Sequence, residues 1–337
     1  MSIKESILSA ESLHIGFYHQ KKPVKLLASE SNLHLHSGNF TCLLGPNGSG
    51  KSTLIRTLAG LQKSIEGQVL LQQQPIENIS LKKKAFLLSM VLTEQPATAN
   101  LSVQDLVAMG RYPYTGLMGR LSKEDMKKTE AAILHTQLEY LRNKKIWQLS
   151  DGERQKAMVA RALAQDTPLI MLDEPTAHLD LNNRVELMYL LKDLSHRLNK
   201  AVLLSTHDLD IALQCADVFW LMQPCEKILS GTPEDLVLQG EFEKTFRGNR
   251  YKFEKSTGTF KVLEEGGKKV SLEGEGIAYF WTKHALERNG FLISDAREKY
   301  HICIKSNHLG NTAWKLETDH RETAEKPSIE ALLRDLK

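Results

Sequence analysis

The sequence predicts an α/β protein with a mainly parallel sheet, followed by a small α+β domain. Three observations carry this prediction. Short apolar strands alternate with helical segments over the first two thirds of the chain, a glycine-rich turn joins a strand directly to a helix, and short amphipathic strands take over beyond about residue 240. Alternation of strands and helices favours a parallel sheet with both faces covered, because each crossover places a helix on one face.

The elements of the first part follow from apolar runs and the residues that break them. Residues 11–45 are expected to form short strands, including 12–18 and 39–44. Residues 96–148 contain helix starts, such as the capping-box pattern from Ser102 to Asp105, so we expect a helical insertion there. The other expected elements are helices at 52–61, 150–165 and 183–198, and strands at 69–72, 86–92, 168–172 and 201–205.

The last part of the chain reads as a separate unit. We expect strands at 258–263, 269–272, 300–305 and 312–317, and helices at 277–289 and 328–336. We therefore place one domain at 1–240, with a helical subdomain at about 96–165, and an accessory domain at 241–337. A regulatory or dimer-bracing role and a simple packing role both stay open for it. Trp281 and Trp314 are expected in its core, and His301, His308 and His320 are expected to be surface or structural residues without ligand spacing.

Composition excludes several classes of protein. The 337 residues suit two domains, and the net charge of +3 gives no support for a nucleic-acid binder. The cysteines have no metal-ligand spacing, and we expect them to be reduced and mostly buried: Cys42, Cys215, Cys225 and Cys303. Residues 1–10 lack the apolar core of a signal peptide, and no stretch is long and apolar enough to span a membrane. If the protein serves a membrane process, other chains supply the pore.

A phosphate-binding loop is the clearest motif. Residues 45–52 match G-x-x-x-x-G-K-[ST] between an expected strand and an expected helix, which is the context that supports the motif. Glycines let backbone N–H groups face a phosphate, and the helix start adds partial positive charge. Lys51 would reach the β/γ-phosphates, and Ser52 would ligate Mg²⁺. The full set expected to bind ATP here is Gly45, Pro46, Asn47, Gly48, Ser49, Gly50, Lys51, Ser52 and Thr53.

Two acids end the apolar strand at 168–172 and fit the second phosphate-site element. Asp173 would hold Mg²⁺, and Glu174 would polarise the attacking water as general base. The alternative is that the two carboxylates only cap the next helix.

The segment Leu149-Ser150-Asp151-Gly152-Glu153 distinguishes among the classes of P-loop protein. It resembles the signature of ABC ATPases, usually Leu-Ser-Gly-Gly-Gln, and the resemblance covers about residues 10–235. It implies a P-loop NTPase core with an antiparallel β subdomain, in which Ser150 and Gly152 contact ATP held by a second copy. The pattern from Ser150 to Glu153 is a capping box in any case. The acids at 151 and 153 depart from the family pattern, and the sequence leaves open whether they face that phosphate.

The resemblance assigns roles to further positions. Gln95 is similar to the Q-loop glutamine that binds Mg²⁺ or orders water, and His207 is similar to the switch histidine that contacts the γ-phosphate and braces Glu174. Asp180 ends a D-loop-like segment that crosses the dimer interface, where His178 replaces a commoner serine or alanine. An aromatic side chain would stack on adenine, and the candidates are Phe17 or neighbouring Tyr18.

The segment Gly110-Arg111-Tyr112-Pro113 is similar to one in ATPases that serve iron-siderophore, haem and cobalamin importers. The alternative is a loop broken by Pro113 in which Arg111 is solvated. The resemblance implies ATP and Mg²⁺ as cofactors and a place on the cytoplasmic side of the inner or cell membrane. The implied partners are transmembrane permease subunits, a second copy of the chain and, indirectly, a substrate-binding protein, with no nucleic acid.

Three other functions compete with import. An exporter subunit is the runner-up. A soluble ABC ATPase of translation or DNA maintenance would carry two nucleotide domains or a long coiled coil, whereas this chain has one domain and about a hundred residues between Lys51 and Ser150. A purely regulatory nucleotide-binding module would not need Glu174 and His207.

Overall fold

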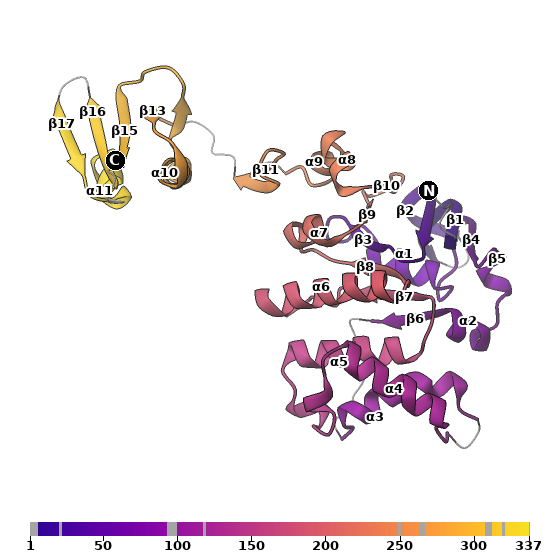
Figure 1. The fold of residues 1–337 in the computed structure, drawn as a ribbon. Coiled ribbons are helices and arrows are strands. Elements are labelled where there is room, and N and C mark those ends of the chain that lie inside the picture. Colours follow the sequence, from indigo (N-terminus) through magenta and orange to yellow (C-terminus); the bar gives the residue numbers. More distant parts are fainter. Residues whose placement is uncertain are drawn as a thin grey trace. The chain divides into compact units, whose positions relative to one another are not determined.

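The computed structural model describes residues 6–19, 22–92, 100–116, 119–248, 251–262, 267–306, 312–318 and 321–336 (Figure 1). The chain divides into two compact units. Unit 1 comprises Met1–Phe246 and Lys255–Thr259, and unit 2 comprises Arg247–Glu254 and Phe260–Lys337. Within the described ranges, no helix is long and apolar enough to cross a membrane.

A six-stranded sheet forms the centre of unit 1, with strand order β10-β9-β3-β8-β7-β6. All its pairs are parallel except β9 with β10, so the predicted mainly parallel sheet is confirmed. Every residue of β3, β7 and β8 is buried, as expected for strands covered on both faces. The strands are β3 Phe40–Leu44, β6 Leu88–Val91, β7 Leu169–Asp173, β8 Ala201–Ser205, β9 Val218–Leu221 and β10 Leu229–Gly231. The helices of this part are α1 Lys51–Leu58, α2 Leu81–Leu87, α6 Leu181–Arg197, α7 Leu209–Cys215, α8 Pro233–Leu238 and α9 Glu241–Thr245.

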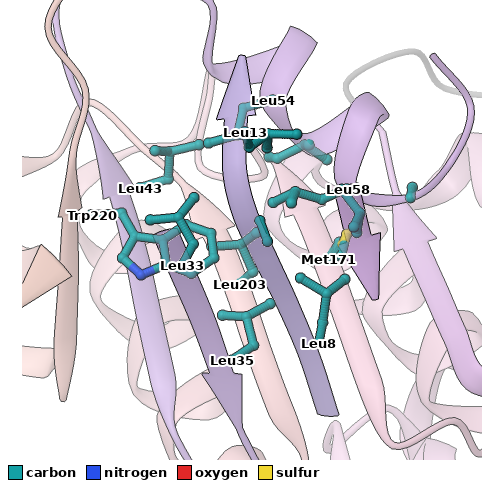
Figure 2. Packing of buried hydrophobic residues seen from close by; sticks show 14 of the residues in the cluster. Leu8, Leu13, Leu33, Leu35, Leu43, Leu54, Leu58, Met171, Leu203 and Trp220 are labelled. Carbon is teal, nitrogen blue, oxygen red and sulfur yellow. The ribbon is translucent and has the colours of Figure 1, made fainter. Parts of the chain in front are cut away.

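A second, antiparallel sheet packs against the first. Its order is β2-β1-β4-β5, from β1 Ser6–His19, β2 Lys22–His36, β4 Glu66–Leu71 and β5 Gln74–Pro75, followed by the 3₁₀ turn η1 Ile76–Asn78. The core lies between the two sheets and α1. Figure 2 shows this packing for Leu8, Leu13, Leu33, Leu35, Leu43, Leu54, Leu58, Met171, Leu203 and Trp220. Each such side chain contributes about 1.5–3 kcal/mol by leaving water, and this core fixes the strand ends that carry the candidate site.

The helical insertion is present as predicted. Figure 1 shows α3, α4 and α5 gathered as a lobe, and these three helices contact one another. The elements are α3 Val103–Ala108, η2 Met109–Tyr114, α4 Lys123–His135, η3 Glu139–Leu141, η4 Ile146–Gln148 and α5 Asp151–Ala164. The capping box at Ser102 is confirmed. The strand expected at 86–92 begins later, because Phe86 and Leu87 end α2.

Unit 2 contains a five-stranded sheet with order β14-β13-β15-β16-β17 and two helices. Its core joins residues of both: Val270 and Ile302 from the sheet, and Leu286 and Leu332 from the helices. The elements are β13 Lys269–Glu273, α10 Gly276–Arg288, β14 Leu292–Ser294, β15 Tyr300–Ser306, β16 Thr312–Thr318, β17 Arg321–Lys326 and α11 Ile329–Leu336. Two further strands, β11 Tyr251–Glu254 and β12 Thr259–Val262, form a two-stranded sheet.

Two expectations about side chains in the chain's core need correction. Trp314 is buried as predicted, but Trp281 is 54% exposed, because α10 turns Thr282, Ala285 and Leu286 inward instead. The cysteines are not mostly buried. Cys42 and Cys215 are buried, whereas Cys225 is exposed and Cys303 is half-buried.

Candidate nucleotide site

The glycine-rich loop connects β3 to α1. Gly48 and Gly50 have φ values of 77° and 109°, which glycine adopts without strain. A Cβ on Gly45 would lie 2.4 Å from the carbonyl oxygen of Met222, so only glycine fits this close backbone approach. Asn47 and Gly48 form the exposed tip of the loop, and Ser52 and Thr53 lie in the first turn of α1. The N–H groups of that turn have no partner within the helix and are available to an anion.

Lys51 lies beneath the loop. Its side chain is only 4% exposed, and its Nζ donates to the carbonyl oxygens of Gly45 (3.0 Å) and Pro46 (3.4 Å). Burial lowers the pKa of Lys51, and the acids Glu174 and Asp173 oppose this by raising it. The hydroxyl of Ser49 is buried without a hydrogen-bond partner among the described residues. An orphaned donor, a buried ammonium and two left-handed glycines fit a phosphate group.

A single serine hydroxyl positions both acids. Ser205 ends β8 opposite Asp173 at the end of β7, and its Oγ donates to Asp173 Oδ1 at 2.7 Å. The same Oγ accepts from the backbone N–H of Glu174 at 2.9 Å. Sequence reasoning gave Ser205 no role. Its signal was its place, two residues before His207 at the end of the strand next to Asp173.

Glu174 lies between two nitrogen donors. Its Oε1 is 2.6 Å from His207 Nε2 and 3.9 Å from Lys51 Nζ. Its backbone φ of 50° is unusual for a residue with a side chain, and such strain clusters at functional sites. The structure thus brings the predicted base, the histidine and the loop lysine together. A hollow of about 500 Å³ opens beside them, lined by Glu174, His207, Asp208, Arg184 and residues 176–180.

The start of α5 carries the signature residues. Glu153 Oε2 accepts from the N–H of Ser150 (2.8 Å), and Ser150 Oγ accepts from the N–H of Glu153 (3.2 Å). Asp151 pairs with Arg154 at 3.3 Å. Both departures from the family pattern therefore have partners within their own helix.

Gly152 and Asp180 meet through one residue that sequence reasoning missed. A Cβ on Gly152 would lie 2.4 Å from Asn183 Oδ1. Asp180 is the N-cap of α6, so the alternative that Asp173 and Glu174 cap this helix is wrong. The Asp180 carboxylate accepts hydrogen bonds from Asn183 N (2.8 Å) and Asn183 Nδ2 (3.1 Å). The sequence feature that could have identified Asn183 is its position three residues after the capping residue Asp180.

The predicted adenine-stacking residue Phe17 lies on a strand of the antiparallel sheet. Phe17 is 48% exposed on β1, whose partner β2 places Leu27 against Gly50 of the loop. The side chain of Tyr18 and all of Gln95 lie outside the described residues.

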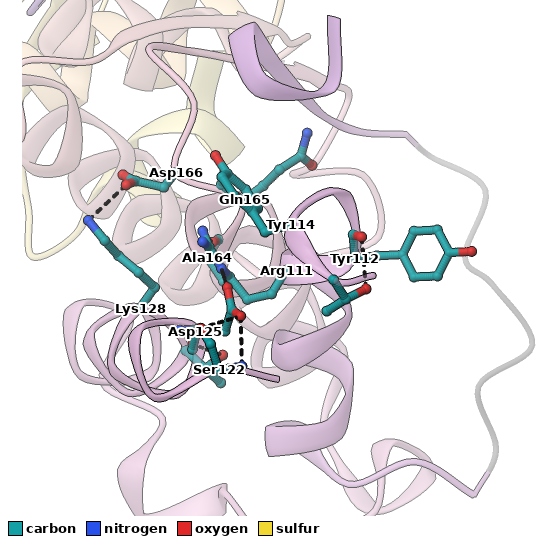
Figure 3. Close-up of polar contacts among 11 residues, drawn as sticks. Arg111, Tyr112, Tyr114, Ser122, Asp125, Lys128, Ala164, Gln165 and Asp166 are labelled. Carbon is teal, nitrogen blue, oxygen red and sulfur yellow. Dashed lines mark hydrogen bonds and ion pairs between the residues drawn. The ribbon is translucent and has the colours of Figure 1, made fainter. Parts of the chain in front are cut away.

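The segment around Arg111 has a structural role. Arg111 is 4% exposed, so the alternative of a solvated side chain is wrong. Its Nε donates to Asp125 Oδ1 (2.9 Å), its Nη1 donates to the carbonyl of Ala164 at the end of α5 (2.8 Å), and its guanidinium lies 3.7 Å from the Tyr114 ring centre (Figure 3). A Cβ on Gly110 would lie 2.2 Å from the carbonyl of Arg161. Gly110 therefore lets η2 pack closely against α5, and Arg111 connects η2 to α4 and α5 by hydrogen bonds.

Comparison with known proteins places the chain. Residues 28–177 match the model of the ABC transporter family, and residues 267–337 match that of the iron ABC transporter C-terminal domain. An uncharacterized ABC transporter ATP-binding protein of Methanocaldococcus jannaschii is 38% identical over 231 residues, which cover 68% of this chain and 78% of that protein. The petrobactin import ATP-binding protein YclP of Bacillus subtilis is 33% identical, covering 66% and 87%. The ferric enterobactin transport ATP-binding protein FepC of Escherichia coli is 32% identical, covering 65% and 81%.

Solved structures agree. A chain of an ABC transporter described as of metal-chelate type, in an inward-facing conformation, has a TM-score of 0.62 at 28% identity and covers 72% of this chain and 89% of its own. The bacterial ABC transporter cassette MJ0796, solved as a dimer, has a TM-score of 0.58 at 25% identity, covering 67% and 98%. These likenesses confirm the predicted ABC ATPase fold. The chain belongs to the ATP-binding proteins of the ABC transporter family.

Proposed function

We propose that this chain is the ATP-hydrolysing subunit of an importer of iron chelates, in which separate permease subunits carry the substrate. The match of residues 267–337 to an iron-transporter domain supports this substrate class. Two relatives also support it, because they are named as ATP-binding proteins of petrobactin import in B. subtilis and of ferric enterobactin transport in E. coli. These observations favour a ferric siderophore over haem or cobalamin, and import over export.

The observation that carries hydrolysis is the carboxylate of Glu174 between His207 and Lys51. The loop N–H groups and Lys51 would bind the ATP phosphates, while Ser52 and Asp173 would hold Mg²⁺, with Gln95 as a further predicted ligand. Mg²⁺, when bound, neutralises charge on the phosphoryl group. Glu174 would accept the proton of the attacking water, and His207 would hold that carboxylate in place. Phe17 would stack on adenine.

The site is proposed to need two chains. Ser150 and Gly152 of a second copy would contact the γ-phosphate, with Asp180 near the interface. Glu153 and Asp151 are engaged with Ser150 and Arg154, and the capping box uses the N–H groups of Ser150 and Glu153. The N–H groups of Asp151 and Gly152 and the Ser150 hydroxyl would therefore hold the anion at the start of α5. ATP would then bind the closed dimer more tightly than the open one and shift that equilibrium. The dimer would sit against the permease on the cytoplasmic side of the inner or cell membrane, and a substrate-binding protein would act only through the permease.

Uptake by cells tests the substrate assignment. Cells lacking this chain should lose accumulation of a radiolabelled ferric siderophore. The wild-type chain should restore it, and Glu174→Gln, expressed at the same level, should not. If the deletion strain takes up the siderophore normally while the purified chain hydrolyses ATP, the substrate class is refuted. The assignment of the chain as an ATPase would still stand.

A further inference from the structure

A group of polar side chains stands on one face of the sheet in unit 2. Ser271 and Glu273 on β13 are register partners of His301 and Cys303 on β15. Because alternate residues of a strand share a face, these four side chains stand together. The intervening Ile302 packs with Val270, Leu286 and Leu332 in the core on the other face. The sequence spacing of the histidines does not indicate this group, because the neighbours of His301 come from another strand and from position i+2.

Three electron-pair donors converge on this face. Cys303 Sγ lies 3.1 Å from His301 Nε2 and 3.4 Å from Glu273 Oε2, and these last two atoms are 3.3 Å apart. In a tetrahedral site, Zn²⁺ bond lengths to sulfur, nitrogen and oxygen give donor separations of roughly 3.3–3.6 Å. The separations of the three atoms are thus close to the edge lengths of such a tetrahedron.

Ser271 fixes which nitrogen of His301 faces the group. Its Oγ lies 2.8 Å from His301 Nδ1, accepts from the N–H of Glu298 (3.1 Å) and donates to the carbonyl of Tyr300 (3.4 Å). Metal binding at Nε2 requires the tautomer in which the Nδ1–H of His301 donates to Ser271 Oγ. The serine oxygen can accept that hydrogen bond, because its own proton has the Tyr300 carbonyl as a partner. Histidine ligands of metals are oriented by a second partner in this way.

We propose that Glu273, His301 and Cys303 bind a divalent transition-metal ion, of the class of Zn²⁺ or Fe²⁺. One carboxylate oxygen, one imidazole nitrogen and one thiolate are the ligands, and the thiol proton passes to solvent on binding. A mixed O, N and S set selects such ions over Mg²⁺ or Ca²⁺. The side chain of Glu273 is 73% exposed and that of His301 14%, so a fourth position faces solvent and takes water. The inference is independent of the transported substrate.

A titration of the full chain with Co²⁺, without nucleotide, tests this site. Binding should give one equivalent of thiolate-to-metal absorption in the near ultraviolet, which carboxylate or phosphate-loop binding cannot produce, and Zn²⁺ should displace it. Cys303→Ser should abolish the absorption. Ser271→Ala, which leaves all three ligands, should raise the Kd by about 10–100-fold. Cys225→Ser, which removes the exposed cysteine of unit 1, should change nothing.

The competing account is a plain ion pair between a doubly protonated His301 and Glu273. It predicts no thiolate absorption at stoichiometric Co²⁺ in the wild-type chain, and that result would overturn the proposal. Absorption of full intensity in Cys303→Ser would overturn it as well. Thermal unfolding of each variant, beside its ATPase rate, verifies that both units are folded before the titrations are compared.

Discussion

At the scale of residues, the hydroxyl of Ser205 connects the two acids of the site. It holds the carboxylate of Asp173 and the N–H of Glu174, which keeps the strained backbone of Glu174 in place. A hydrogen bond to a charged group contributes about 1.5–3 kcal/mol. Ser205 therefore acts on the site through its neighbours, as a positioning residue.

Ser205→Ala should lower both stability and turnover. The expected loss is about 2 kcal/mol of unfolding free energy, together with a decrease of kcat, because Asp173 and Glu174 lose their common anchor. Ser195→Ala is the matched control: Ser195 is equally buried, and its Oγ donates to the carbonyl of Lys200. The free energy of unfolding, measured with denaturant, should fall for both variants. The kcat of steady-state ATP hydrolysis should fall only for Ser205→Ala. Equal kcat in the two variants would contradict the positioning role.

At the scale of elements, Arg111 joins three parts of the helical insertion. Its guanidinium links η2 to the start of α4 through Asp125 and to the end of α5 through Ala164. The other end of α5 carries the signature residues. The segment that resembles importer ATPases is thus explained by packing, which orients the helix that would meet ATP.

Gly110→Ala should disturb this packing. A Cβ would press on the carbonyl of Arg161, a backbone atom that cannot turn away, so we expect a loss of about 1–3 kcal/mol. Gly116→Ala lies six residues on, where a Cβ would meet nothing within 4 Å, and should change stability by less than about 0.5 kcal/mol. Hydrogen exchange of the α4 and α5 amides measures the difference. Equal protection in both variants would refute the close-contact argument.

Asp125→Asn should show a pH signature. The hydrogen bonds from Ser122 and the nearby Arg111 hold the pKa of Asp125 below its ordinary value. A carboxylate with a lowered folded pKa stabilises above the unfolded pKa of about 4, and this contribution disappears as pH falls through the folded pKa. The variant should therefore lose about 3–5 kcal/mol at pH 7. The gap to wild type should close in acid below about pH 4.

Asp105→Asn provides the control for that prediction. Asp105 makes the same capping-box contacts, with Ser102, on an exposed helix start. Its loss at pH 7 should be about 1 kcal/mol. Unfolding midpoints measured from pH 7 to 3 compare the two, and equal losses at pH 7 would show that the Arg111 pair adds nothing.

The sequence predicted what depends on local pattern. The parallel strands, the capping boxes and the glycine-rich loop between β3 and α1 follow from neighbours in the chain, and the structure has them. What it could not predict depends on register between distant strands. Ser205 gains its role only because β7 and β8 pair, and His301 meets Glu273 only because β13 and β15 pair. The prediction that Trp281 is buried was wrong because α10 carries apolar residues on both sides. The buried face of this helix could therefore not be identified from the sequence.

At the scale of the whole molecule, the central claim is a motor whose ATP site is completed by two chains. In the proposed mechanism, the phosphate loop, both acids and His207 would form one nucleotide site of this chain, while Ser150 and Gly152 start a helix that would serve the other copy. ATP binding would then drive dimerisation, and hydrolysis would release it.

The most direct measurement is ATPase rate against protein concentration with Mg²⁺, beside the same series for Glu174→Gln, with the oligomeric state followed by light scattering. The account predicts a wild-type rate that rises faster than linearly. It also predicts a variant that is dimeric in ATP, with turnover lowered by about 10²–10⁴-fold. A rate strictly proportional to concentration in a chain that stays monomeric, or normal turnover in Glu174→Gln, would contradict it.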